Sequence, residues 1–244
     1  EGVRYLSSVG AGVTASGGLF EYRAGDRVEF SIGDIQLGAA LAGPVITPGD
    51  LEPVDGASAA TMERSVNVAR FLQTLDDDRD LSNGIQITPL MHDLAAGRTI
   101  DFSKSLSKFS DDGAVQILVA DLTATRPTGP QMLVSPDRSL HHFGGTLNSL
   151  ISELTRQMDE LIGPATCAAA SECDAIAVGH RACGGPGAYR AFSTSVTSAA
   201  ELEAIASQHR QHSRALNIVN QVVSICSIVP KPAVDCVANR CLAQ

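Results

Sequence analysis

Apolar and polar residues alternate near the start of the chain, as they do in half-buried β-strands. The alternation occurs in four short stretches, residues 3–6, 19–22, 28–32 and 35–37. Turn-forming pairs separate these stretches, namely Gly17-Gly18, Gly25-Asp26 and Gly33-Asp34. A period of two residues interrupted by glycine-containing turns predicts a short antiparallel β meander within residues 1–45.

Helical spacing replaces this alternation after Pro44 and Pro48. Apolar residues three and four positions apart predict an amphipathic helix over about residues 62–75 and a second one over residues 112–124. An antiparallel sheet followed by helices is typical of α+β proteins.

Proline and glycine mark the limits of two further helices. Thr88-Pro89 predicts the start of a short helix that ends at Gly97. Ser135-Pro136 predicts the start of a long helix that ends at Gly163-Pro164. Because glycine lowers helix stability by roughly 1 kcal/mol relative to alanine, we expect a bend or a break at Gly144-Gly145.

The last third of the chain predicts a small module with the element order β-β-α-β-β. Two strands, at residues 175–178 and 189–192, flank a turn at Cys183-Gly184-Gly185-Pro186-Gly187. Ser198 and Glu201 form a capping-box pattern that predicts a helix to about Asn217. Two closing strands are expected at residues 219–229 and 234–242.

The whole chain is thus predicted to be an α+β protein with three parts. These are a β-rich meander at residues 1–45, a helical segment with an acidic loop at residues 46–163, and a disulfide-rich α+β module at residues 164–244.

All six cysteines fall in the last third of the chain: Cys167, Cys173, Cys183, Cys226, Cys236 and Cys241. An even, clustered count predicts disulfides, and the absence of any CxxC pair argues against zinc, although the connectivity does not follow from spacing. Disulfides persist in oxidising compartments, so we expect an extracellular, cell-surface or periplasmic location. A chain that begins at Glu1 without an initiator methionine is also expected of a processed, exported protein.

The net charge of −9 is unevenly distributed along the chain. Residues 1–162 carry 12 basic and 22 acidic side chains, against 6 and 5 in the remainder. An acidic surface repels nucleic-acid phosphates and attracts divalent cations, although it can also serve solubility alone. Nucleic acid is therefore not an expected partner, and no apolar run approaches the roughly 20 residues of a transmembrane helix.

Alternating acidic residues directly follow the predicted helix at residues 62–75. Asp76, Asp78 and Asp80 stand at every second position, and Asn83 follows them. Carboxylates at positions 1, 3 and 5 of a tight loop can converge on one calcium ion, which takes six to eight oxygen ligands. These four residues are therefore candidate ligands of a structural calcium ion.

The loop also departs from an EF-hand at three positions. Leu81 replaces the glycine of position 6, Ile87 replaces the bidentate glutamate of position 12, and Arg79 places a positive charge among the ligands. The alternative to calcium is an acidic turn at the helix end, where acidic residues oppose the helix dipole and call for a cation.

Motifs of catalysis are missing from the sequence, since there is no GxSxG elbow, no phosphate-binding glycine loop and no HExxH helix. Cys183 lies near His180, but an even cysteine count favours a disulfide over a thiol nucleophile. His209 and His212 stand one helical turn apart without an identifiable third metal ligand, so we expect them to be solvated. The chain is not predicted to be an enzyme.

The first half resembles a module at the start of many proteobacterial surface lipoproteins and secreted proteins, over about residues 3–122. The residues that carry the resemblance include Gly18-Leu19-Phe20-Glu21-Tyr22, Gly25-Asp26-Arg27-Val28-Glu29-Phe30, Ile46-Thr47-Pro48-Gly49-Asp50-Leu51 and Asn67-Val68-Ala69-Arg70-Phe71-Leu72-Gln73-Thr74-Leu75-Asp76. Residues 165–244 resemble small cysteine-rich domains of secreted bacterial proteins, through Cys183-Gly184-Gly185-Pro186 and the other cysteines. Both resemblances imply export and a surface location, and neither implies a reaction.

The expected function is that of an exported structural or adhesive protein. Its expected partner is a further copy of itself, in a homo-oligomer or a filament, or another surface protein. A secreted inhibitor of a hydrolase, presenting a loop from Gly184 to Ala188, is the alternative. A secreted hydrolase of unfamiliar type is a third hypothesis.

Overall fold

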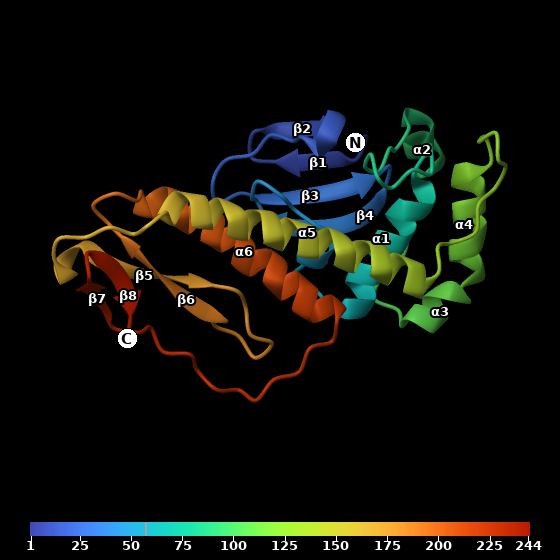
Figure 1. The fold of residues 1–244 in the computed structure, drawn as a ribbon. Coiled ribbons are helices and arrows are strands. Elements are labelled where there is room, and N and C mark those ends of the chain that lie inside the picture. Colours follow the sequence, from blue (N-terminus) through green and yellow to red (C-terminus); the bar gives the residue numbers. More distant parts are fainter. Residues whose placement is uncertain (57) are drawn as a thin grey trace. The chain divides into compact units, whose positions relative to one another are not determined.

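The structure is a computed structural model that describes residues 1–56 and 58–244. The chain divides into two compact units, unit 1 (Glu1–Phe143) and unit 2 (Gly144–Gln244). Both helices and antiparallel strands occur, which confirms the predicted α+β class (Figure 1).

Unit 1 begins with an antiparallel sheet, as predicted. Its strands are β1 (Arg4–Ser7), β2 (Gly10–Val13), β3 (Arg27–Ile32) and β4 (Ile35–Leu41), in the spatial order β2-β1-β3-β4. The order differs from that of a simple meander because β3 pairs with β1 and leaves β2 at the edge.

The strand predicted at residues 19–22 does not form, because these residues lie outside every helix and strand. Phe20 instead packs its ring against the ring of Phe30, with centroids 5.4 Å apart, and against that of Tyr5, 5.9 Å away. The alternation of apolar residues at this point therefore reflects ring packing onto the sheet and not strand pairing.

A two-residue turn joins β3 to β4, as the Gly33-Asp34 pair predicted. Gly33 has a φ of 56°, and its N–H donates to Nδ1 of His92 at 2.8 Å. A Cβ at this position would lie 2.5 Å from the His92 carbonyl oxygen, so both the backbone conformation and the close approach require glycine.

Four helices complete this part of unit 1: α1 (Met62–Leu75), α2 (Pro89–Leu94), α3 (Leu106–Ser110) and α4 (Gly113–Thr123). Three of them coincide with the predicted helices, whereas α3 was not predicted. The Thr61 side chain accepts a hydrogen bond from the Arg64 N–H and so caps α1. The buried side chains of Val28, Ile32, Phe71 and Leu118 belong to one core, which joins the sheet to α1 and α4.

The long helix α5 (Pro136–Ile162) has 27 residues and runs without interruption through Gly144-Gly145. The break expected at these glycines is therefore absent from the helix. Buried Leu147, Leu154 and Met158 form an apolar stripe, whose burial outweighs the roughly 1 kcal/mol that each glycine costs. The boundary between the two units nevertheless falls directly before Gly144.

Unit 2 contains β5 (Cys173–Val178), β6 (Ala188–Ser193), α6 (Ala199–Val219), β7 (Val234–Val237) and β8 (Arg240–Ala243). The first two strands and the helix were predicted, and the Ser198 side chain caps α6 by accepting from the Glu201 N–H. A small core of buried residues that includes Met158, Phe192 and Leu202 lies beneath the β5–β6 hairpin.

Unit 2 has the predicted element order β-β-α-β-β, but the positions predicted for the two closing strands are wrong. Residues 222–233 contain no helix or strand, and Pro230 and Pro232 remove backbone donors there. Residues 234–243 form a complete hairpin in place of a single strand, and Cys236 lies opposite Cys241 in the register of its two strands. Its turn residues Ala238 and Asn239 have φ angles of 50° and 61°, the conformation of a tight two-residue hairpin turn.

Candidate functional site

Asp76 ends α1 and begins the acidic loop at residues 76–86. Its side chain is buried, and Oδ1 accepts a hydrogen bond of 2.9 Å from the Gln86 N–H. The other carboxylate oxygen, Oδ2, is enclosed and has no hydrogen-bond partner. Burial raises the pKa of Asp76 above its ordinary value, since a charged carboxylate is poorly solvated there.

The other candidate ligands fold the loop back on itself. Asp78 accepts from the Asp80 N–H at 2.9 Å through Oδ1, and from the Asn83 side-chain amide at 2.7 Å through Oδ2. The hydrogen bond from Asn83 lowers the pKa of Asp78. Asp80 accepts from the Ser82 N–H at 3.0 Å. The structure therefore brings all four predicted residues into one loop.

The three carboxylates do not converge on one point. Across the described residues, the single group of three or more acidic, histidine or cysteine ligand atoms within 4.8 Å of one another consists of Cys167, Cys173 and Cys241. The acidic loop also has a cation of its own, because the buried Arg126 guanidinium lies 3.7 Å from Asp77 Oδ1. Arg126 also donates to the Thr74 carbonyl at 2.9 Å and so fixes the end of α1.

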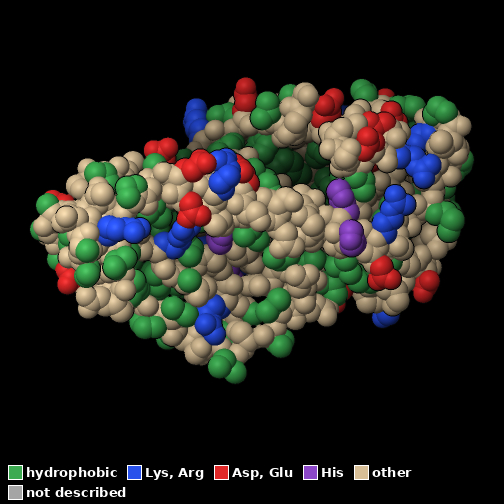
Figure 2. Space-filling view, viewed as in Figure 1, with side chains coloured by type: hydrophobic (Ala, Val, Ile, Leu, Met, Phe, Trp, Pro, Cys, Tyr) green, Lys and Arg blue, Asp and Glu red, His purple; other side chains and the backbone are tan. Residues whose placement is uncertain are grey.

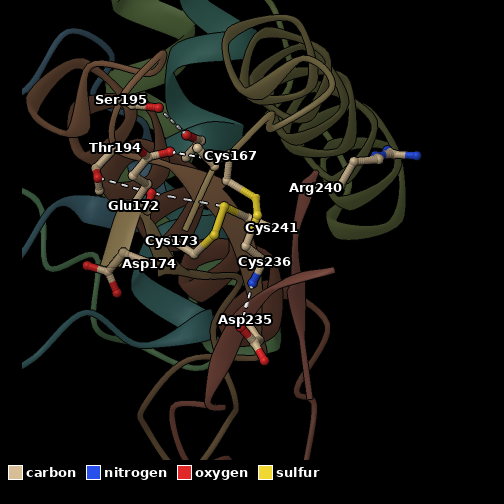
Figure 3. The surroundings of a disulfide bond; sticks show 12 residues. Cys167, Glu172, Cys173, Asp174, Thr194, Ser195, Asp235, Cys236, Arg240 and Cys241 are labelled. Atoms are coloured by element: carbon tan, nitrogen blue, oxygen red, sulfur yellow. Dashed lines mark hydrogen bonds between the residues drawn. A yellow bond between two sulfur atoms is a disulfide. The ribbon is translucent and has the colours of Figure 1, made fainter. Parts of the chain in front are cut away.

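The six cysteines form three disulfides, Cys167–Cys236, Cys173–Cys241 and Cys183–Cys226. The first two lie side by side and connect β5 and the segment before it to the β7–β8 hairpin (Figure 3). Their sulfur atoms are bonded to each other and are not thiolates, so they cannot form a zinc site. Three disulfides indicate an oxidising compartment outside the cytoplasm.

The third disulfide holds an exposed turn against an exposed segment. Gly184 and Gly185 have φ angles of 97° and 78°, and the Arg181 N–H donates to the Gly185 carbonyl at 3.0 Å. From the other side of the Cys183–Cys226 bond, the Ser227 hydroxyl accepts from the Arg181 side chain at 3.0 Å. The turn and the segment are thus tied together by covalent and polar contacts.

The segment around Cys226, residues 222–228, exposes large apolar side chains. Val223 is 93% exposed, Ile225 82% and Ile228 90%. The density of apolar residues predicts a strand over residues 219–229, which does not form. The two following prolines were the available signal that the segment does not continue into a sheet.

The histidines of α6 are less solvated than expected. His212 is fully buried, and Nδ1 of the half-buried His209 accepts a hydrogen bond of 3.1 Å from the Gly179 N–H. Burial, together with the nearby charge of Arg190, lowers the pKa of His209. The expectation of solvated side chains was wrong, because these histidines lie on the packed side of the helix.

The surface carries both positively and negatively charged side chains. Basic and acidic side chains are interspersed on the face shown in Figure 2, and neither forms a continuous patch there. Among the helices of the described residues, none has the length and apolar character required to cross a membrane. Comparison with protein-family models, with curated proteins and with solved structures found no match.

Proposed function

We propose that this chain is an exported structural or adhesive protein of the cell surface or extracellular space, which assembles with further copies of itself through residues 222–228. One observation carries the proposal, the exposure of Val223, Ile225 and Ile228 on a segment anchored by the Cys183–Cys226 disulfide. Contiguous exposed apolar side chains are typical of surfaces that bind a partner.

The backbone of this segment favours pairing with another extended chain. Within the described residues, only two of its N–H groups donate to protein atoms, those of Val222 to the Asn217 carbonyl at 2.9 Å and of Ser227 to the Ile225 carbonyl at 2.7 Å. The remaining N–H groups are left to water. Such a row of free N–H groups can donate to the carbonyl groups of an added strand, while alternate side chains provide apolar contacts.

Size-exclusion chromatography with light scattering, followed by negative-stain microscopy, tests the proposal. The disulfide-bonded protein is expected to form oligomers or filaments, and the triple variant Val223→Ser, Ile225→Ser, Ile228→Ser is expected to remain monomeric. The matched control replaces three other exposed apolar residues, Leu19, Leu41 and Val196, with serine and should assemble like the original protein. A protein that stays monomeric at every concentration contradicts the proposal.

The second part of the proposal is a structural calcium ion bound by the acidic loop. The enclosed, unpartnered Oδ2 of Asp76 supports this part of the proposal, because a buried carboxylate oxygen is costly unless a proton or a cation accompanies it. Asp78, Asp80 and Asn83 supply further oxygens on the same loop, but their present hydrogen bonds would have to rearrange around the ion.

Thermal unfolding in calcium and then in chelator tests the ion separately. We expect a higher melting temperature with calcium, and Asp78→Asn should remove the difference because it weakens the ligand set. Asp93→Asn, at an exposed position of α2, is the matched control and should keep the calcium response. Identical melting curves in calcium and chelator would contradict the calcium site.

A second candidate function is inhibition of a hydrolase by the turn at Gly184 and Gly185. The turn is exposed and is fixed by the hydrogen bond to Arg181 and by the Cys183–Cys226 disulfide. A loop fixed in this way loses little conformational entropy on binding. Inhibition of one member of a protease and lysozyme panel, lost in the variant Pro186→Trp, would favour this function, and no inhibition of any member would contradict it.

A further inference from the structure

A cavity of about 240 Å³ in unit 1 lies between the end of α1, the acidic loop and the start of α5. We propose that it binds the oxyanion group of a small molecule, a carboxylate or a phosphate attached to a short apolar body. Arg79, Arg138 and Gln73 belong to the polar part of its wall, and Leu81 and Met132 to the apolar part.

The charge of the cavity wall is positive. Arg79 and Arg138 are exposed and line the cavity, whereas no acidic side chain does so among the described residues. The structure of residues 1–56 and 58–244 shows no ion pair or side-chain hydrogen bond of either guanidinium. Guanidinium groups bind carboxylates and phosphates through charge-assisted hydrogen bonds, and two of them lie beside this cavity.

This placement also accounts for an anomaly of the acidic loop. Arg79 interrupts a series of aspartates, where a positive charge would weaken cation binding. Its φ of 64° is unusual for a residue other than glycine, and the residue forms part of the cavity wall. Arg79 therefore serves a different site from that of the neighbouring carboxylates.

The first turn of α5 adds a second source of positive potential. Ser135 precedes the helix, and its hydroxyl oxygen accepts from the Arg138 N–H at 3.4 Å. The dipole of a helix of 27 residues places about half a positive charge at its N-terminus, where the acidic side chain of Asp137 also lies. Ser135 and Arg138 both belong to the cavity wall, so an anion in the cavity lies next to this helix end.

The buried carboxamide of Gln73 is a further polar group of the cavity wall. Gln73 is 7% exposed, lines the cavity and has an enclosed Oε1 without a hydrogen-bond partner. An unpartnered buried carboxamide is costly, because it loses its bonds to water without replacement. The N–H₂ group of the same carboxamide is not enclosed and can donate to an oxyanion bound in the cavity.

Titration calorimetry and NMR at constant ionic strength, with inorganic phosphate, butyrate and neutral butyramide as probes, test the proposal. Phosphate, butyrate or both should bind with a dissociation constant on the order of 1 mM, whereas butyramide should not. The anion that binds identifies the headgroup. The side-chain amide resonances of Gln73 should shift on binding, a readout that requires no variant.

Substitutions separate this site from general electrostatic attraction. Arg138→Gln and Arg79→Gln should each weaken anion binding about tenfold, as expected for the loss of one charge-assisted hydrogen bond. Arg23→Gln changes the net charge equally at an exposed position outside the cavity and should leave the affinity unchanged. No binding by either anion, or equal weakening by all three substitutions, would overturn the proposal.

Discussion

At the scale of single residues, the polar side chains of α1 organise the loops of unit 1. Asn67 donates to the Phe102 and Lys104 carbonyls at 3.0 and 2.8 Å. Arg70 is 1% exposed and donates to the Val134 carbonyl at 2.7 Å and to the Ser110 hydroxyl at 2.8 Å. Burial lowers the pKa of Arg70 to about 10. These buried polar residues of α1 thus have a structural role.

Replacement of Arg70 by methionine should strongly destabilise unit 1. The substitution keeps an unbranched side chain but removes the donor of the Val134 carbonyl and the hydrogen bonds to Asn67 Oδ1 and the Ser110 hydroxyl, so we expect a loss of roughly 3 kcal/mol in the free energy of unfolding. Urea unfolding measures it, and exposed Arg23→Met is the control, expected to change stability by less than about 0.5 kcal/mol. Equal effects of the two substitutions would contradict a role for the buried hydrogen bonds.

Protonation of His209 should destabilise unit 2 in acid. The pKa of this side chain lies below 6.5 in the folded state, because burial and the nearby Arg190, His212 and Arg210 disfavour the charged form. The unfolded chain therefore binds a proton more readily, so the contribution is complete above about pH 6.5 and is lost as the pH falls through the lowered pKa. Protonation also removes the acceptor of the Gly179 N–H.

Urea unfolding at pH 7.5 and pH 5 measures this effect. The variant His209→Asn keeps an acceptor near the position of Nδ1 without a titrating group, so its stability should decrease less at pH 5 than that of the original protein. His212 is unchanged in both proteins, which isolates His209. An identical pH dependence of the two proteins would contradict the assignment.

At the scale of elements, local sequence rules predicted the helices better than the closing strands. Periodicity and caps identified α1, α2, α4 and α6, since these signals lie within one helix. Residues 19–22 and 222–229 have strand-like composition, but a strand requires a partner that is specified by distant parts of the chain. The same limit applies to the disulfides, whose existence followed from the cysteine count and whose pairing did not.

The candidate site shows the same division between local and distant information. The acidic loop could be found in the sequence because Asp76, Asp78 and Asp80 are close along the chain. The ion pair of the buried Arg126 with Asp77 depends on tertiary packing, and so does the position of Arg138 beside the cavity that Arg79 also lines. The location of the loop can therefore be predicted from the sequence, but its charge balance cannot.

The turn of the β7–β8 hairpin provides a prediction for a single element. Asn239 has a φ of 61°, a conformation that asparagine and glycine tolerate and a β-branched residue does not. We expect Asn239→Val to lower the free energy of unfolding by about 1–2 kcal/mol, and Asn239→Gly to have a smaller effect. Urea unfolding under oxidising conditions measures both variants, and equal stability of the two would contradict the strained turn.

At the scale of the whole molecule, the two units are stabilised by different means. Unit 1 has an extended apolar core, whereas the core of unit 2 is small and includes Cys167 and Cys241. The disulfides Cys167–Cys236 and Cys173–Cys241 join residues 69 and 68 positions apart. In the chain-entropy treatment, one such crosslink stabilises a fold by about 4 kcal/mol, and the two overlapping loops do not add fully.

Reduction should therefore unfold unit 2 and leave unit 1 folded. Hydrogen exchange with mass spectrometry, with and without a thiol reductant, measures this difference for peptides of each unit. We expect α6 to lose protection on reduction and α1 to keep it, because unit 1 contains no cysteine. Loss of protection in both helices, or in neither, would contradict the separate stabilisation of the units.

Self-assembly through residues 222–228 is the central claim, and hydrogen exchange of this segment at low and high protein concentration tests it most directly. Assembly should slow exchange of the Val223, Ile225 and Ile228 amides, which have no protein acceptor in the described residues of a single chain. The serine variant of these three residues should exchange rapidly at both concentrations. Unchanged, rapid exchange in the original protein across the concentration range would contradict the account.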